Sequence, residues 1–507
     1  MINADKPILT SSEDKLNRAP LAQSIAEMIL SRKSSDSIVI GIESAWGTGK
    51  TSFINLILEK IKTKVYPVEF NPWNFSDDVS LLSDFFNAFS KIPPISKKGK
   101  IKKLFVNYSK KLSYIGLQSV NIFGVSLNPF KSSEEEPLSE LRMKLNKNLR
   151  RLLRKVVVII DDIDRLDADE TKLIFKLVKN TANFPNTIFI LSYDRIKVEA
   201  ILSDERNGIE GSEYLKKIIQ VSFILPEAEK QDINQILFDD IDVILLNVYD
   251  ELEIDQSYWE LIFHRGFKNL FKSVRDIKSY INSLSLDWSL VSKEDINRVD
   301  FIAIVAIRVF AHEFYVAMRN HKHLFTGVPD SDSILSIDKD GMEETYLNLL
   351  EKVPEEVRAH INDICKQIFP PIQFGTGYSS NIHDEWRKKL RICSPDKFDF
   401  YFKMAVPKDA VTESDIQRVL RTLNDIGSFV SVLKELDDVL LIRKFLRQLL
   451  DYIDELNKNE VIILILGSWE LSDWVDETKY GYSSLESIET LVTVRRQLKV
   501  DSKGVIS

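Results

Sequence analysis

Cysteine is nearly absent from this sequence of 507 residues, which contains only Cys365 and Cys393. The two thiols do not have metal-ligand spacing, and a chain of this length can hold its core together without disulfides. The N-terminus also lacks a basic stretch followed by an apolar block, which is the pattern of a secretory signal. We therefore expect a protein of the reducing cytoplasm.

The sequence also has no excess of positive charge. It contains 68 Lys and Arg residues and 76 Asp and Glu residues, which gives a net charge of −8. This balance argues against a protein that coats nucleic acid over its whole surface. A local basic patch remains compatible with it.

Several familiar site patterns are absent or broken. The chain has no GxSxG nucleophile elbow and no guanine-reading NKxD motif. The stretch AHEFYV begins like a zinc-protease HExxH motif but has Val316 in place of the second histidine. His321 and His323 stand two residues apart in an expected loop, which is more typical of a solvated loop than of a metal site.

Buried strands and helices account for much of what the sequence does contain, which is 44% apolar residues. In the first 225 residues, continuously apolar runs alternate with helical patterns, as in a parallel sheet that is buried on both faces. After Pro226 the apolar residues follow helical spacing, for example over 231–252, 301–318 and 429–456. The predicted fold class is therefore α/β, a mostly parallel sheet flanked by helices, followed by a mainly α-helical C-terminal half. The predicted strands are 37–43, 65–70, 156–161, 187–192 and 220–225.

One segment, at about 91–137, breaks this alternation and is predicted to be an insertion between strands. From Lys91 to Lys111, every charged residue is a lysine, and there is no Asp or Glu. The uncharged stretch 112–130 is too polar for a membrane span, which needs about 20 predominantly apolar residues. We expect a solvated or lightly ordered insertion, with contact to an anionic membrane surface or to nucleic acid as the alternative.

The stretch GIESAWGTGKTSF, residues 41–53, follows the first predicted strand and leads into a helix. It matches the phosphate-binding pattern GxxxxGK[ST] at Gly49, Lys50 and Thr51, but Ser44 replaces the first glycine. Backbone N–H groups of such a loop face the phosphates, the lysine meets their oxygens and the hydroxyl binds Mg²⁺. Ser44 is tolerated if its φ is negative, whereas a left-handed φ costs roughly 1 to 2 kcal/mol. We expect a working nucleotide site of the P-loop NTPase kind, formed by Ser44, Ala45, Trp46, Gly47, Thr48, Gly49, Lys50, Thr51 and Ser52.

A carboxylate cluster follows the third predicted strand, at the end where α/β sheets bind ligands. Asp161 is expected to hold Mg²⁺, and Asp162 is the best candidate to orient or deprotonate the attacking water. Asp167 and Asp169 fit helix N-cap positions.

The fourth predicted strand ends in polar residues. Ser192 or Asp194 could sense the γ-phosphate, but an ordinary strand exit or helix cap is the favoured interpretation.

These features together resemble the KAP family of P-loop NTPases. The likeness rests on Trp46 inside the loop and on four further stretches: FNPWNF (70–75), DDIDRL (161–166), YLKKIIQVSFILP (214–226) and SVRDIKSYINSL (273–284). The stretch RICSPDKFDFYFKMAVP (391–407) resembles the helical C-terminal part of soluble bacterial members. Family members often carry membrane helices between the two nucleotide motifs, and here these look absent or degenerate, which favours a soluble form.

The resemblance implies ATP as the nucleotide, Mg²⁺ as the cofactor, and hydrolysis that drives conformational change. Lys50, Thr51, Asp161 and Asp162 match the motifs residue by residue. It also implies protein partners from the same operon, because soluble members occur in phage-defence operons such as Qat. A homo-oligomer is also compatible with the sequence, which leaves the oligomeric state open. A scaffold that holds ATP with little or no hydrolysis is the alternative function. An NTPase associated with membrane or nucleic acid through Lys91–Lys111 is a weaker one.

Three segments are expected along the chain: an NTPase core over 1–230, a helical lid over 231–300 and a helical domain over 301–507. Arg275 in the lid resembles the catalytic arginine that such lids lower onto the γ-phosphate, although a surface residue bonded to Asp276 or to a neighbouring helix is as good an explanation. Arg165 could act on the site of a neighbouring subunit, but pairing with Asp162 or Asp164 is the favoured interpretation.

Overall fold

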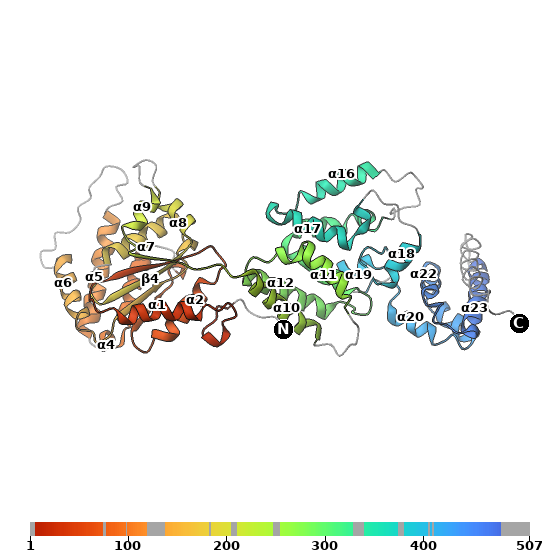
Figure 1. The fold of residues 1–507 in the computed structure, drawn as a ribbon, viewed down its shortest axis with the longest axis horizontal. Coiled ribbons are helices and arrows are strands. Elements are labelled where there is room, and N and C mark those ends of the chain that lie inside the picture. The colour runs from red at the N-terminus through yellow and green to blue at the C-terminus, as the bar shows by residue number, and fades with distance from the viewer. Residues whose placement is uncertain are drawn as a thin grey trace. The chain divides into compact units, whose positions relative to one another are not determined.

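The computed structural model describes residues 6–74, 78–97, 99–118, 137–181, 184–203, 210–246, 254–327, 339–373, 380–403, 406–407 and 410–477. The chain divides into two compact units (Figure 1). Ala4–Leu237 together with Ser273–Arg275 form one, here called the N-terminal unit. Phe238–Lys272 and Asp276–Ser507 belong to the other, the helical unit. The predicted division into core, lid and C-terminal domain stays a prediction.

A five-stranded parallel sheet in the order β2-β3-β4-β1-β5 forms the centre of the N-terminal unit, so the predicted fold class is confirmed. Each strand begins and ends within one residue of its predicted limits. The observed strands are β1 (Ile38–Glu43), β2 (Tyr66–Phe70), β3 (Val156–Ile160), β4 (Thr187–Tyr193) and β5 (Val221–Ile224).

The expectation that every strand is buried on both faces is wrong for the two edge strands. Side chains of β3 and β4 are buried throughout, but those of β2 and β5 alternate between more and less buried positions. Val68 and Phe70 of β2 join the core on one face of the sheet, whereas Phe223 of β5 packs against the core on the other. Each edge strand therefore contributes to only one of the two helical layers.

Helices α1 and α2 pack on one face of the sheet and the remaining helices of the unit lie on the other (Figure 1). These elements are α1 (Ala19–Ser31), α2 (Lys50–Ile61), α3 (Asp78–Ser90), α4 (Pro93–Ser96), α5 (Gly99–Gln118), α6 (Leu138–Leu149), α7 (Ala168–Thr181), α8 (Arg195–Leu202) and α9 (Gly211–Lys216).

The predicted insertion is only partly as expected. Its lysines between 91 and 103 are exposed where the structure describes them, but the segment that carries them is not lightly ordered. Phe105 and Tyr108 of α5 are buried: Phe105 stacks on Phe89 of α3 and Tyr108 meets Phe86 of α3 edge to face, with ring centroids 5.6 Å and 5.3 Å apart. Aromatic burial therefore anchors α5 to the core. Residues 119–136 of the insertion lie outside the described residues.

The helical unit is built from helices alone in the residues that the structure describes. Two of its helices, α10 (Lys230–Leu246) and α12 (Val274–Leu290), begin in the N-terminal unit and cross into this one. Its other elements are α11 (Gln256–Arg265), α13 (Arg298–Phe310), α14 (His312–Arg319), α15 (Lys322–Thr326), α16 (Lys339–Leu350), α17 (Glu355–Ile368), α18 (Ser380–Lys388), α19 (Phe398–Lys403), α20 (Glu413–Leu420), α21 (Ile426–Lys434), α22 (Val439–Leu449) and α23 (Lys458–Glu477).

Several predicted helices of this unit are divided. The helix expected over 301–318 is interrupted at Ala311, and the amphipathic stretch 429–456 is interrupted between α21 and α22. His323 lies inside α15 rather than in the expected loop. Among the helices in the described ranges, none combines the length and apolar character that crossing a bilayer requires.

Candidate nucleotide-binding site

The loop between β1 and α2 has the backbone conformation that its glycines permit. Gly47 and Gly49 have φ angles of 85° and 91°, in the left-handed region, and Gly49 is the N-cap of α2. Ser44 is not among the residues with positive φ, so serine stands there without backbone strain. Its N–H donates to the carbonyl of Tyr193 at 3.3 Å, and its hydroxyl contacts that of Thr48. The missing first glycine therefore does not distort the loop.

Lys50 is buried at the base of this loop. Its Nζ donates to the carbonyl oxygens of Ser44 and Ala45 at 3.0 Å and 3.2 Å. The same Nζ lies 3.6 Å from Oδ2 of Asp164. The ammonium group is thus held where the loop amides and the N-terminus of α2 converge, which is the arrangement that binds phosphate.

The chain brings Thr51 and Asp161 together from elements 110 residues apart. Oγ1 of Thr51 donates to Oδ2 of Asp161 at 2.6 Å. A hydroxyl and a carboxylate are hard oxygen ligands of the kind that Mg²⁺ prefers, so this pair fits the ion. Bound there, Mg²⁺ would neutralise phosphate charge.

Asp162 follows at a turn with a φ of 59° and is engaged by an arginine. Nε of Arg165 lies 3.0 Å from Oδ1 of Asp162, which is the favoured pairing. Burial and then the neighbouring Asp161 carboxylate raise the pKa of Asp162 above its ordinary value, against the opposing effect of Arg165.

Asp164 was not expected in the site. Its side chain is 1% exposed and faces Lys50 from the short 3-10 helix Ile163–Arg165. Within the part of the chain that the structure describes, neither of its oxygens accepts a hydrogen bond. The sequence signal that could have found it is the third acid of DDIDR, which pattern matching assigns to no role.

Arg18 is a second residue that sequence reasoning missed. It is buried, its Nη1 donates to the carbonyl oxygen of Thr48 in the loop, and its Nη2 donates to that of Pro226 at 2.7 Å. The guanidinium therefore ties the loop to the chain just after β5. A single arginine ahead of α1 gives no motif from which this contact could be predicted.

A buried carboxylate network adjoins the loop at the end of β1. Glu43 accepts hydrogen bonds from the Tyr193 hydroxyl at 2.8 Å, from Nη1 of Arg195 at 3.1 Å and from the Ser222 hydroxyl. Burial and the bond to Glu43 raise the pKa of Tyr193. The network joins β1, β4 and β5 and fixes the strand end from which the loop starts.

The two polar residues at the end of β4 have different positions. Asp194 is the N-cap of α8, because Oδ1 accepts from the N–H groups of Ile196 and Lys197 at 3.1 Å and 3.5 Å. The favoured capping interpretation is thus confirmed for this residue. The Ser192 hydroxyl is fully buried and makes no hydrogen bond to a described residue. Asp167 also caps a helix, as expected, accepting from the first residues of α7.

Arg275 lies beside the loop but on an aromatic ring. Its guanidinium carbon is 4.5 Å from the centroid of the Trp46 ring, a cation–π distance. Trp46 is otherwise exposed. The proposed contact of Arg275 with a γ-phosphate stays a prediction.

Ser52, the last residue of the predicted loop, contacts the segment that precedes α1. Its hydroxyl accepts from the N–H of Ile8 at 3.3 Å, and Asn55 donates to the carbonyl of Ile8 at 2.8 Å. The Ser52 hydroxyl therefore has a structural partner.

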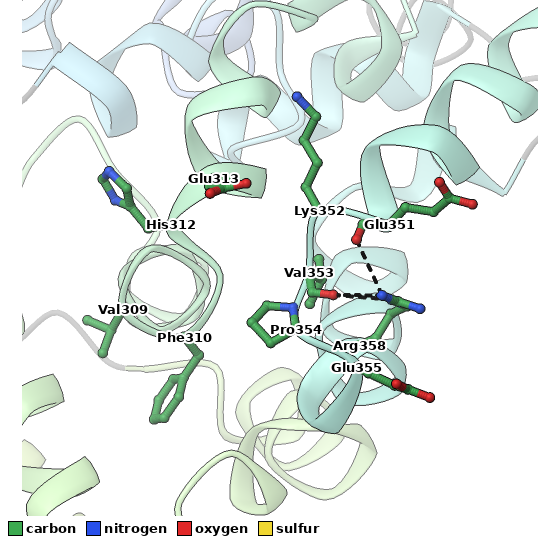
Figure 2. A pocket seen from close by; sticks show the side chains of 10 residues that line it. All are labelled: Val309, Phe310, His312, Glu313, Glu351, Lys352, Val353, Pro354, Glu355 and Arg358. Carbon is green, nitrogen blue, oxygen red and sulfur yellow. Dashed lines mark hydrogen bonds between the residues drawn. The ribbon is translucent and has the colours of Figure 1, made fainter. Parts of the chain in front are cut away.

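An open groove of about 480 Å³ in the helical unit contains none of these residues (Figure 2). Acidic and basic side chains line it together, and the Arg358 guanidinium donates to the carbonyls of Glu351 and Val353. It has no convergent set of polar groups of one chemistry. Among the described residues, no group of three or more His, Cys, Asp or Glu side chains is placed to hold a metal ion. The loop between β1 and α2 is therefore a better candidate for a ligand site than this groove.

The chain is similar to several known proteins. A curated relative, the phage T7 exclusion protein of Escherichia coli K12, is 30% identical over 488 residues. That alignment covers 82% of this chain and 64% of the relative, so the chain spans less than two thirds of the relative's length.

Solved structures align more loosely. The Aeropyrum pernix ORC1 protein in complex with DNA aligns with 75% of this chain and 88% of its own, at 13% identity and a TM-score of 0.33. The replication initiator DnaA bound to AMPPCP and single-stranded DNA aligns with 80% of this chain and 100% of its own, at 14% identity and a TM-score of 0.33.

The family comparison covers the site itself. The KAP family P-loop domain matches residues 18–290, just over half of the chain, from Arg18 through both nucleotide motifs to the end of α12. The resemblance seen in the sequence is therefore confirmed, and the chain belongs to the KAP family of P-loop NTPases.

Proposed function

We propose that this protein binds and hydrolyses ATP with Mg²⁺ and couples its nucleotide state to the engagement of partner proteins. The observation that supports this most directly is the 2.6 Å contact between the Thr51 hydroxyl and the Asp161 carboxylate, beside the buried ammonium of Lys50. Three groups from two distant motifs thereby meet at the C-terminal edge of a parallel sheet, where α/β folds bind ligands.

Each residue has a distinct role in this proposal. The loop amides from Ser44 to Ser52 and the Lys50 ammonium bind the phosphates, and Thr51 and Asp161 hold Mg²⁺. Asp162 orients the attacking water. Arg275 would leave the Trp46 ring to stabilise charge on the γ-phosphate.

Phosphate release by the purified full chain tests the enzymatic proposal. We expect Mg²⁺-dependent turnover by wild type, loss of it in Lys50→Ala, and wild-type rates in Lys62→Ala, an exposed lysine after the same helix. Turnover in wild type no higher than in Lys50→Ala, with and without candidate partners, would contradict it.

The relative named phage T7 exclusion protein supports a role for this chain in excluding phage. We propose that the chain acts in this role with proteins of its own operon. Plating efficiency of phage T7 on cells that express the chain with its operon partners tests this role. We expect fewer plaques with wild type than with Lys50→Ala at equal expression. Equal plaque numbers would count against it.

A nucleotide-gated scaffold is the second candidate. The ion pair between Asp162 and Arg165 favours it, because the carboxylate that is proposed to orient water is already paired with a guanidinium. Tight binding of a labelled ATP analogue that survives Asp162→Ala, together with negligible wild-type turnover, would support the scaffold over the enzyme.

The exposed lysines of the α4–α5 segment support a weaker proposal, contact with nucleic acid or anionic lipid. Binding of this kind weakens steeply with added salt. Binding that is absent or independent of salt would remove it.

A further inference from the structure

Asp164 is a buried carboxylate that the roles above leave unused. Its side chain is 1% exposed, and both of its oxygens lack a hydrogen-bond donor among the described residues. Burying an ionised carboxylate without such donors is costly unless a charge lies close to it. Such a group in a folded protein calls for an explanation by function or by a bound species.

Local structure does not supply that explanation. The 3-10 helix that contains Asp164 is closed by the N–H of Arg165 donating to the backbone carbonyl of Asp162, and the Asp164 carboxylate caps nothing in it. Lys50 is the basic group facing it, at 3.6 Å and itself only 7% exposed. Among the described residues, the other partners of that ammonium are the neutral carbonyls of Ser44 and Ala45. The pair is therefore held together mainly by charge.

We infer that Asp164 is a positioning residue that holds Lys50 in the nucleotide-free protein and competes with nucleotide phosphates for it. This inference rests on the proposed nucleotide site and deepens it, because it concerns how tightly that site binds. Phosphates that approach the loop meet a neutral Lys50–Asp164 pair instead of an unpaired cation. They also meet a carboxylate at short range in a site of low dielectric.

Competition of this kind predicts that removing the Asp164 charge increases nucleotide affinity. Asp164→Asn keeps the shape of the side chain and removes its charge, so ADP and ATP should both bind more tightly than to wild type, by about ten-fold. A merely structural residue would behave in the opposite way, because its loss loosens the loop and weakens binding. In wild type, this competition weakens the binding of the product ADP, which speeds nucleotide exchange.

Calorimetric titration of the full chain with ADP and with a non-hydrolysable ATP analogue, both with Mg²⁺, tests the inference. Asp164→Asn should lower both dissociation constants about ten-fold. Asp164→Glu, which keeps the charge, should bind close to wild type. Asp169→Asn, which removes an exposed acid nearby on α7, is the matched control and should leave both constants unchanged.

The inference is overturned if a folded Asp164→Asn variant binds nucleotide no more tightly than wild type does. It is also overturned if Asp164→Glu binds nucleotide as much more tightly than wild type as Asp164→Asn is expected to. If the asparagine variant does not fold, Asp164→Ser removes the same charge with a smaller side chain and carries the same expectation. Absence of nucleotide binding in wild type would instead defeat the proposed function, so the two failures are distinguishable.

Discussion

Ser44 shows how far a single departure from a motif matters. Its φ is not left-handed, so a glycine there would relieve no strain. We expect Ser44→Gly to change nucleotide affinity little. Gly49→Ala, in contrast, places a Cβ at a φ of 91° and 3.2 Å from Nη1 of Arg18, and should weaken binding about ten-fold or more.

Equilibrium binding of a labelled nucleotide to both variants measures this difference. A gain in affinity in Ser44→Gly comparable to the loss in Gly49→Ala would show that the first position of the pattern does need glycine.

Thr51 offers a second test at the residue scale. Thr51→Ala removes the hydroxyl that contacts Asp161 and should reduce the gain in nucleotide affinity on adding Mg²⁺ by about ten-fold. Thr51→Ser keeps the hydroxyl and is the matched control. Titrations with Mg²⁺ and with EDTA give the ratio directly, and an unchanged ratio in Thr51→Ala would remove Thr51 from the metal site.

Of the residues that form the candidate site, the sequence pointed to those in contiguous motifs and missed those that make contacts across the fold. Gly49, Lys50 and Asp161 follow known spacing, and their meeting is explained by the shared edge of parallel strands. Arg18 and Glu43 have partners far away in the sequence, at Pro226 and Tyr193. Their contacts with distant backbone and hydroxyl groups leave no periodic or spaced signal in the chain.

At the scale of elements, the break between α21 and α22 is the clearest case in which periodicity misled. The apolar residues of 429–456 keep helical spacing, but Asp437 has a φ of 49° and Asp438 is the N-cap of α22. Oδ1 of Asp438 accepts from the N–H groups of Leu440 and Leu441 at 2.8 Å and 3.1 Å. Two acidic residues in a row therefore start a new helix, a signal that the apolar pattern obscures.

This cap gives a stability prediction. Asp438→Ala should lower the free energy of unfolding of the helical unit by about 1 kcal/mol, because two N–H groups of α22 lose their acceptor. Asp437→Gly, the control, should not destabilise, since glycine adopts the left-handed region freely. Urea denaturation followed by circular dichroism measures both, and equal effects of the two changes would argue against the cap.

Strand positions were predictable because their apolar runs are short and bounded, but edge positions were not. Ser222 and Glu69 are polar residues within otherwise apolar runs, and only strand order decides that β5 and β2 lie at the edges. The packed helix α5 was missed for a related reason. Its many lysines conceal Phe105 and Tyr108, which share its buried face.

Helix α18 carries a histidine whose protonation should affect stability. Burial and then Arg447 lower the pKa of His383, against the opposing effect of Asp384, and Nδ1 has no hydrogen-bond partner among the residues described. In the unfolded chain the pKa returns to about 6.5. Below that pH the unfolded state binds the proton more readily, so stability falls as pH falls and levels off below the folded pKa.

We therefore expect the helical unit of wild type to lose more stability between pH 7.5 and pH 5.5, about the range over which a free histidine titrates, than the unit of His383→Gln. Melting temperatures of both proteins at the two pH values measure the difference. A parallel loss in the two proteins would show that other groups account for the acid sensitivity.

At the scale of the whole molecule, the chain has separate hydrophobic cores in its two units. The clusters around the sheet contain residues from Ala22 to Leu225, whereas a distinct cluster contains Val411 to Leu471. The sequence predicted a core, a lid and a C-terminal domain, but no change in composition marks the point at which one core ends. The residues of the candidate nucleotide site from Arg18 to Asp164 belong to the N-terminal unit, as does Arg275, whose contact with the γ-phosphate is a prediction.

Nucleotide should therefore stabilise one unit selectively. A ligand that binds only the folded state adds about 2.7 kcal/mol at a concentration 100 times its dissociation constant. For a unit of this size that corresponds to an increase in melting temperature of about 5 to 10 °C.

Differential scanning calorimetry with ATP and Mg²⁺ should show the transition of the N-terminal unit moving upward while that of the helical unit stays in place. Lys50→Ala should remove the shift, and Lys62→Ala should keep it. The residues named for the candidate site belong to the N-terminal unit. An equal shift of both transitions would therefore mean that nucleotide binding is coupled to the folding of the helical unit, which the position of these residues alone does not predict.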